Sequence, residues 1–247
     1  MQAFKSREYD FREDFYSKNW ATGYKFPAVK NGWVIKESVP NLAPASRQYF
    51  VLNLRREKFQ DIRVREAFAL AFDFAWTNKN LFYGAYSRSL SLFQNTDMAA
   101  RSLPNDAEKK LLKSIKGKIP TSIRTAVYQP PGEGSGLRKN LRRAKKRLSQ
   151  GGWKIIDGKL TDKHGKVLEI EILTFSPVFE RILAPIIKNL KRLGIQANIR
   201  IVDTAQYTFR MQTFDFDVTT AAFGTSATPG ITEKNFWGSA AAKQEGG

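Results

Sequence analysis

The sequence predicts an α/β fold, and two stretches of the chain carry this prediction. Between residues 167 and 223, segments in which apolar and polar residues alternate are separated by segments with an apolar residue every three or four positions. These are the periods of strands and of amphipathic helices, respectively. Residues 49–84 show the same succession of a strand and a helix. Strands and helices joined by short connections are typical of a layered α/β domain.

The earlier stretch begins with an alternating segment from Tyr49 to Leu54, which we expect to be a strand. Asp61 is a suitable N-cap for the helix that follows, because its carboxylate can accept the free N–H groups of the first turn. The residues expected to face the core from this helix are Val64, Ala67, Phe68, Ala71 and Phe72. A shorter helix is expected from Thr77 to Gly84, since glycine favours a helix end.

Turns and loops flank this stretch. The pair Asn31-Gly32, between two apolar segments, predicts a tight hairpin turn. A helix is expected from Asp106. Its apolar residues, which we expect to be buried, are Leu111, Leu112 and Ile115. Residues 117–136 are rich in glycine and proline and predict a flexible connector.

The most basic segment runs from Arg138 to Arg147, where seven of ten residues are lysine or arginine. Its apolar residues recur at helical spacing, which predicts an amphipathic helix with the charges on the opposite face. They are Leu137, Leu141, Ala144 and Leu148. The pair Asp157-Gly158 then predicts a two-residue hairpin, and His164 lies in a second turn, where we expect it to be exposed.

Three strands and two helices are expected between residues 167 and 223. The strands are predicted at residues 168–172, 195–201 and 214–218. One helix follows Pro177, and the other is capped by Asp203 or Thr204. After Val218 the chain is rich in glycine, serine, threonine and proline, which predicts a loop at the end of the last strand.

The composition excludes several kinds of site. The 247 residues include no cysteine and one histidine, His164. Disulfides, thiolate metal sites and cysteine nucleophiles are therefore excluded, and neither a histidine-based zinc site nor a Ser-His-Asp triad is expected. No apolar run approaches the ~18 residues that cross a bilayer. The charged and aromatic start of the chain does not resemble a secretory signal.

The net charge of +18 raises an alternative function, a basic nucleic-acid-binding protein that uses the helix from Arg138 to Arg147. Because no aromatic platform or base-reading motif accompanies this helix, a solvated face is the favoured interpretation. An enzyme would have only scattered carboxylates to use, such as Asp215 and Asp217. These alternate with apolar residues, so an exposed strand face explains them better than an acid–base pair. We expect no catalytic residue and no metal site.

The order of residues in several segments resembles one family. Asn53, the run FQDIRVREA at 59–67, the run AFD at 71–73 and Gly84 resemble a patterned segment of the dipeptide/oligopeptide-binding family, the extracellular solute-binding proteins of peptide ABC importers. The helix ends at 151–153 and 193–195 and the strand at 214–218 also resemble that family. Residues 21–37 resemble its branch associated with microcin C uptake.

The resemblance implies the substrate-binding component of an ABC importer, located in the periplasm. Such a protein is not an enzyme and needs no cofactor. It captures a peptide or peptide-like ligand in a cleft and delivers it to a membrane permease. Nucleic acid is not an expected partner.

The resemblance also implies a periplasmic-binding-protein-like lobe, with a mixed sheet flanked by helices. Residues 49–247 are expected to form the second (C-terminal-type) ligand-binding lobe, truncated at both ends relative to the family. Residues 1–48 are expected to be a partial segment of the lobe that precedes the hinge strand. The two-lobe clamp is then incomplete, and a missing first lobe of the same protein is the expected partner.

Ligand-binding residues are expected in two places. Phe223, Ser226 and Trp237 belong to the loop region after a strand end, where open α/β sheets place ligands. Asn53 and Arg55 are cleft candidates because the resemblance places them near the interlobe hinge.

The sequence departs from the resemblance at the expected cleft. In many family members an aspartate shortly after the strand-end aromatic pairs with the α-amino group of the ligand, and an arginine three positions before that aromatic can serve a ligand carboxylate. This chain has no carboxylate at residues 224–227, and it has Thr220 in place of the arginine. The same anchoring of peptide termini is therefore not expected.

Overall fold

The computed structural model describes residues 1–115 and 119–244, which fold into two compact units. The first unit combines Met1–Asn41 with Phe74–Ser87, and the second combines Leu42–Asp73 with the chain from Arg88 onward. Residues 74–87 therefore belong to the first unit, although they follow the expected hinge strand in the chain. The assignment of residues 1–48 and 49–247 to two lobes of a larger protein stays a prediction.

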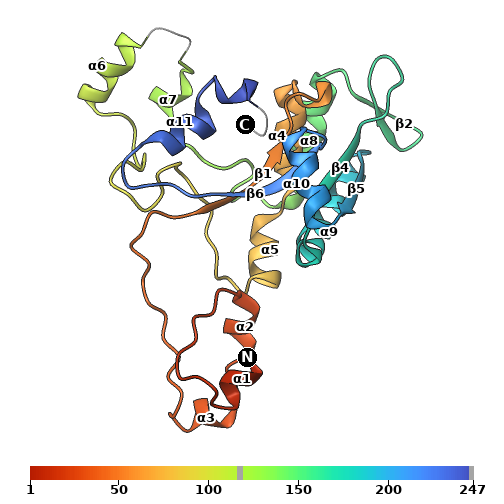
Figure 1. Ribbon diagram of the computed structural model, residues 1–247. Helices are drawn as coiled ribbons and strands as arrows, with labels where there is room; N and C mark the ends of the chain where they lie inside the picture. Colours follow the sequence, from red (N-terminus) through yellow and green to blue (C-terminus); the bar gives the residue numbers. More distant parts are fainter. Residues whose placement is uncertain (116–118, 245–247) are drawn as a thin grey trace. The chain divides into compact units, whose positions relative to one another are not determined.

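The first unit consists of short helices and connecting loops (Figure 1). Its helices are α1 (Gln2–Lys5), α2 (Ser17–Thr22), α3 (Pro27–Lys30) and α5 (Phe74–Leu81). The hairpin predicted at Asn31-Gly32 is wrong, because the apolar segment before it forms α3. Pro27 suits the first position of a helix, and Gly32, with a φ of 75°, follows its end.

The second unit contains a four-stranded mixed sheet, which confirms the expected α/β architecture. Its strands, in spatial order, are β1 (Arg47–Leu52), β6 (Val218–Phe223), β4 (Glu169–Thr174) and β5 (Gln196–Ile201). β4 pairs in parallel with both β5 and β6, whereas β1 pairs with β6 in the antiparallel direction. Figure 1 shows β6 running beside β1. A separate hairpin, β2 (Lys154–Ile156) and β3 (Lys159–Thr161), turns at the predicted Asp157-Gly158 pair.

Helices cover both faces of this sheet. The main core joins one face to α4 (Ile62–Ala71), α8 (Leu137–Gln150) and α9 (Glu180–Arg192). Strand residues in this core include Phe50, Leu52, Ile170, Ile172 and Val218. A smaller core on the opposite face joins Leu173 and Val51 to Tyr207 and Met211 of α10 (Thr204–Gln212). In β1 and β4, neighbouring residues therefore enter different cores, as the period of a strand requires.

The predicted helices of this core are confirmed together with their caps. The carboxylate of Asp61 accepts a hydrogen bond from the N–H of Arg63 at the start of α4, and Asp203 does the same for Gln206 in α10. The carboxylate also accepts a hydrogen bond from Nε of the Arg63 side chain, and this side-chain bond is the main cause that lowers the pKa of Asp61. In α8, Leu141, Ala144 and Leu148 are buried against α4, as their spacing predicts.

Two predictions about elements of this unit are wrong. The last strand occupies Val218–Phe223 and not residues 214–218, because the chain turns before it through Phe214, whose φ is 55°. Helix α6 (Asp106–Ser114) begins after an Asn105 cap, and its apolar stripe is not buried. Leu111 and Ile115 are 64% and 49% exposed.

The remaining short elements lie in loops. The connector expected at 117–136 contains α7 (Ser122–Thr125), while residues 116–118 lie outside the described part of the chain. Helix α11 (Ile231–Trp237) follows β6, and 3-10 turns occur at Glu57–Phe59, Pro177–Phe179 and Ala241–Lys243. No described helix is both long and apolar enough to span a bilayer.

Candidate functional site

Four aromatic side chains gather where β6 ends, and we call them the aromatic cluster: Tyr49, Phe223, Phe236 and Trp237. Phe223 is the last residue of β6, and its ring centroid lies 5.9 Å from that of Tyr49 in β1. The rings of Phe236 and Trp237 in α11 lie 5.2 and 5.5 Å from it. Both residues of α11 remain about half exposed, at 47% and 50%. The cluster therefore presents partly exposed aromatic surface, which can stack on apolar or planar groups of a ligand.

The position of the cluster in the sheet is the one in which ligands are expected. Phe223 ends β6, which is parallel to β4, so the cluster lies at the carboxyl edge of the parallel strands. Open α/β sheets bind ligands outside this edge. Phe175, directly after β4, is 47% exposed, and its ring lies 4.9 Å from that of Tyr207.

The loop between β6 and α11 is held by one carboxylate. Glu233 accepts hydrogen bonds from the N–H of Gly230 at 2.8 Å and from the hydroxyl of Thr225 at 3.1 Å. The bond from Gly230 is the main cause that lowers the pKa of Glu233. Ser226 is exposed, and its hydroxyl donates to the carbonyl of Thr228 at 2.6 Å. To donate a hydrogen bond to a ligand, the Ser226 hydroxyl would therefore have to break its hydrogen bond to Thr228.

Asn53 occupies a different place, directly after the other end of β1. Asn53 is 4% exposed, and its side-chain amide donates hydrogen bonds to the carbonyls of Phe214 and Phe216 at 2.8 and 2.9 Å. Its side-chain oxygen accepts from the N–H of Arg55 at 3.0 Å. Both polar groups of the amide are thus bonded to the backbone of the chain itself, which gives Asn53 a structural role.

Arg55 lies at the same end as Asn53. Its guanidinium carbon is 3.4 Å from the centre of the Phe214 ring, a cation–π contact. Its Nη2 donates to the carbonyl of Ala242 at 2.6 Å. Arg55 therefore joins the turn before β6 to the segment after α11.

The five predicted ligand-binding residues thus fall into two groups. In the antiparallel pair of β1 and β6, Leu52 lies opposite Val218 and Arg47 lies opposite Phe223. Asn53 and Arg55 follow the first of these pairs, whereas Phe223 and Trp237 lie at the second. A strand of this length separates the two ends by roughly 17 Å, at about 3.4 Å per residue. The structure brings Phe223 and Trp237 together and places Asn53 and Arg55 apart from them.

Three residues at the carboxyl edge were not predicted from the sequence. Tyr49 and Phe236 complete the aromatic cluster, and Arg47 is the first residue of β1. Arg47 is 3% exposed, and its Nε and Nη1 have no hydrogen-bond partner among the described residues. Burial raises the pKa of Tyr49, while the positive charge of Arg47 lowers it in part. The signal for Arg47 in the sequence is a charged residue shortly before the apolar run Tyr49–Leu52.

The carboxylates considered for catalysis are paired with cations. Asp215 bonds to Arg56 at 2.8 Å and to Arg210 at 3.1 Å, and Asp217 bonds to Lys58 at 2.6 Å. The pairs with Arg56 and Lys58 hold the turn before β6 to the chain after β1, and the pair with Arg210 holds it to α10. In the described residues, no group of three or more histidine or acidic side chains is arranged to hold a metal ion. His164 is exposed in a turn, as predicted.

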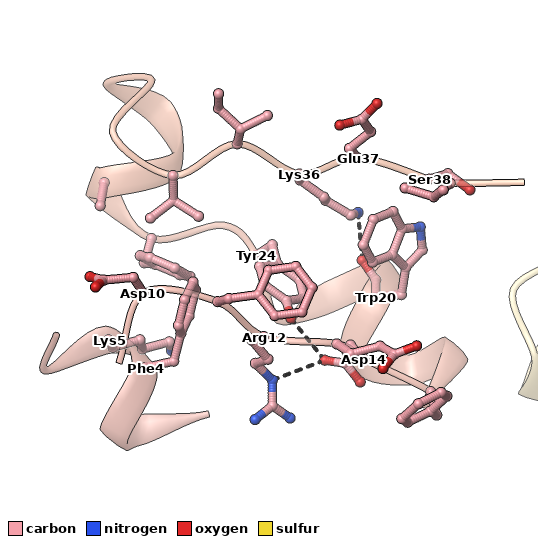
Figure 2. A pocket seen from close by; sticks show the side chains of 18 of the residues that line it. Phe4, Lys5, Asp10, Arg12, Asp14, Trp20, Tyr24, Lys36, Glu37 and Ser38 are labelled. Atoms are coloured by element: carbon pink, nitrogen blue, oxygen red, sulfur yellow. Dashed lines mark hydrogen bonds and ion pairs between the residues drawn. The ribbon is translucent and has the colours of Figure 1, made fainter. Parts of the chain in front are cut away.

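The first unit has a groove of its own, with a volume of about 1650 Å³. Figure 2 shows Asp14 in this groove between Arg12 and Tyr24, which bond to it at 3.5 and 3.0 Å. Burial alone would raise the pKa of Asp14, but hydrogen bonds from Tyr16, Tyr24 and Arg12 together hold it below its usual value. Lys36 donates to the carbonyl of Trp20 at 2.6 Å. Arg12, Asp14 and Lys36 of this groove are therefore bonded within the unit.

Comparison with solved structures shows the class of fold. The chain is similar to a lactococcal OppA complexed with an endogenous peptide, with a TM-score of 0.64 and 17% identity over 94% of this chain and 41% of that one. It is also similar to the oligopeptide-binding protein AppA from Bacillus subtilis, in complex with a nonapeptide. There the TM-score is 0.60 and the identity 20%, over 89% of this chain and 37% of that one. The fold is that of a part of a periplasmic-binding-protein-like molecule.

Comparison of sequences identifies the family. Residues 1–244 match the model described as "Bacterial extracellular solute-binding proteins, family 5 Middle". The chain is 42% identical to the "Probable peptide-binding protein YejA" of Agrobacterium fabrum, over 100% of this chain and 41% of that protein. It is 33% identical to the "Peptidoglycan-binding protein YepA" of the same organism, over 93% of this chain and 38% of that protein. The chain belongs to the family of bacterial extracellular solute-binding proteins, family 5. It spans about two fifths of the length of these relatives.

Proposed function

We propose that this chain provides one side of the ligand-binding clamp of a solute-binding protein that captures peptides or peptide-like compounds. In the periplasm, the complete protein delivers its ligand to the membrane permease of an ABC importer. Membership of the family and the similarity to the probable peptide-binding protein YejA of Agrobacterium fabrum support the ligand class. The protein binds its ligand without chemical change, since the described carboxylates at 215 and 217 are engaged in ion pairs.

The observation that carries the proposal is the position of the aromatic cluster. The rings of Phe223 and Trp237 are partly exposed, and they lie at the carboxyl edge of three parallel strands. A peptide laid across these rings would bury apolar surface, while its amides could bond to the loop that contains Ser226. Asn53 then stabilises the fold and does not bind the ligand, because its side chain is bonded to the turn from which β6 begins.

The rest of the clamp comes from other parts of a longer protein. The first unit exposes large apolar side chains, including Phe11 at 83%, Phe15 at 74% and Ile35 at 85%. Exposed apolar surface of this kind is usually covered by a partner surface. One side of a cleft encloses only part of a ligand, so the 247-residue chain should bind peptides weakly, with half-saturation in the millimolar range.

A backbone NMR titration with trialanine tests where the ligand binds. We expect saturable shifts of the amide signals in residues 47–49 and 220–238, and none in 53–58 or 214–217. Phe223→Ala and Trp237→Ala should each raise the half-saturation concentration at least fivefold, because stacking surface is lost. Trp33→Ala is the matched control, since Trp33 is an exposed tryptophan of the first unit, and it should change nothing. Shifts confined to residues 53–58, or no saturable shift at all, would refute this site.

A further inference from the structure

Arg47 has an environment that is unusual for an arginine. The residue is 3% exposed, yet neither Nε nor Nη1 has a hydrogen-bond partner among the described residues. Buried charged groups are normally paired, because the loss of hydration is otherwise uncompensated. A guanidinium presents its N–H groups in a planar fork that matches the two oxygens of a carboxylate or phosphoryl group. Within the described part of the chain, Nε and Nη1 of this buried cation therefore keep their capacity to donate hydrogen bonds to an anion.

The strand register places Arg47 at the candidate site. Arg47 lies directly opposite Phe223 in the antiparallel ladder, so their side chains are on the same face of the sheet. Tyr49, two residues further along β1, is on this face too, and its ring contacts that of Phe223. The charge of Arg47 also acts on the hydroxyl of Tyr49. The unpaired guanidinium thus adjoins the aromatic cluster at the carboxyl edge.

We infer that Arg47 binds an oxyanion of the ligand, which in a peptide is its terminal carboxylate. This inference rests on the proposed function, and it specifies that the ligand group bound at this position is anionic. The aromatic cluster stacks on the body of the ligand, and Arg47 neutralises its anionic end. Nε and Nη1 are enclosed in the unliganded chain, so the side chains around Arg47 shift when the oxyanion enters.

The test compares trialanine with trialanine amide in NMR titrations of the 247-residue chain. The two peptides differ in the terminal carboxylate. We expect the free acid to have at least a fivefold lower half-saturation concentration than the amide. Arg47→Met, which keeps the length of the side chain but removes the charge, should abolish this difference. Arg47→Lys should retain part of it. Arg200→Met is the matched control, because Arg200 is an exposed arginine of β5 in the same sheet, and it should leave the difference intact.

Inorganic phosphate distinguishes a general oxyanion site from one selective for peptide carboxylates. If phosphate competes with trialanine for the parent chain but not for Arg47→Met, the site accepts oxyanions in general. If phosphate does not compete with trialanine for the parent chain, the site is selective for the peptide carboxylate. Both outcomes support the inference. Thermal unfolding supplies a readout without ligand. Removal of an unpaired buried charge should leave the midpoint of Arg47→Met at or above that of the parent chain.

Three results would overturn the inference alone. They are equal half-saturation for the two peptides, a preference for the acid that persists in Arg47→Met, and a lower unfolding midpoint for this variant. Failure of both peptides to bind the parent chain would instead overturn the proposed function, and the inference with it. The two failures are therefore distinguishable.

Discussion

Asn53 connects two parts of the chain that are distant in sequence. Its amide bonds to the carbonyls of Phe214 and Phe216, while its own N–H bonds to the carbonyl of Asp217 at 2.9 Å. The residue therefore fixes the turn that delivers the chain into β6. This geometry explains why an asparagine suits the position, since an amide can donate two hydrogen bonds and accept others at once.

Asn53→Asp tests this structural role. The aspartate has the same shape but no donors, so it would face two carbonyl oxygens with a negative charge. We expect a loss of roughly 2 kcal/mol or more in the free energy of unfolding, measured in urea, because buried acceptors lose their partners.

Asn198→Asp is the control for Asn53→Asp, since Asn198 is exposed in β5, and it should cost less than about 0.5 kcal/mol. The half-saturation concentration for trialanine should stay within about twofold of the parent in folded Asn53→Asp. A large rise without a loss of stability would show instead that Asn53 contacts the ligand.

Sequence patterns predicted single residues well where the cause is local. Asp61 and Asp203 cap helices as expected, because a cap bonds to N–H groups two or three residues away. Arg47 could not be predicted in this way. Its burial and its position opposite Phe223 depend on a strand far along the chain.

Among the elements, the helices of the main core and the strands β4 and β5 were predictable, whereas the start of β6 was not. The alternation of residues 214–218 matches a strand, but Asn53, Arg56 and Lys58 bind this segment and turn it before the strand begins. The stripe of α6 was identified correctly, but the expected burial of Leu111 was wrong because burial depends on the neighbouring elements. Local periodicity predicts which side of an element is apolar, and tertiary contacts decide whether that side is covered.

Helix α8 illustrates both faces of an amphipathic element. Leu141, Ala144 and Leu148 enter the main core, and Arg147 pairs with Glu66 of α4. Its remaining basic residues point to solvent. They are Arg138, Lys139, Arg142, Arg143, Lys145 and Lys146. The buried stripe accounts for the helix without a nucleic-acid partner, so the basic face is interpreted as a solvated surface.

The combined change of Arg142, Arg143, Lys145 and Lys146 to glutamine tests this interpretation. We expect the parent chain to bind duplex DNA no more tightly than about 1 μM at physiological salt, the range of nonspecific attraction between charges. The fourfold variant should bind more weakly still, with trialanine binding unchanged. Nanomolar DNA binding by the parent chain at physiological salt, which weakens steeply as salt rises and disappears in the variant, would favour the nucleic-acid alternative.

At the scale of the whole molecule, the chain matches about two fifths of the length of each relative named above. The family model covers residues 1–244, and the curated relatives are more than twice as long as the chain. The sequence predicted this class through a patterned segment, and the sheet of the second unit agrees with it. The identity of the ligand could not be predicted, because the motifs that carry the resemblance identify the class of protein and not the group that is bound.

The most direct test of the central claim is peptide binding by a hybrid protein. In it, this chain replaces the matching 41% of the Agrobacterium relative, to which it is 42% identical. The probe is a random mixture of tripeptides to pentapeptides, and the readout is the rise of the thermal unfolding midpoint. We predict that the hybrid is stabilised to a similar degree as the intact relative, while the 247-residue chain alone shows less than a tenth of that rise. A folded hybrid that the peptides do not stabilise, or an isolated chain stabilised as strongly as the hybrid, would contradict the account.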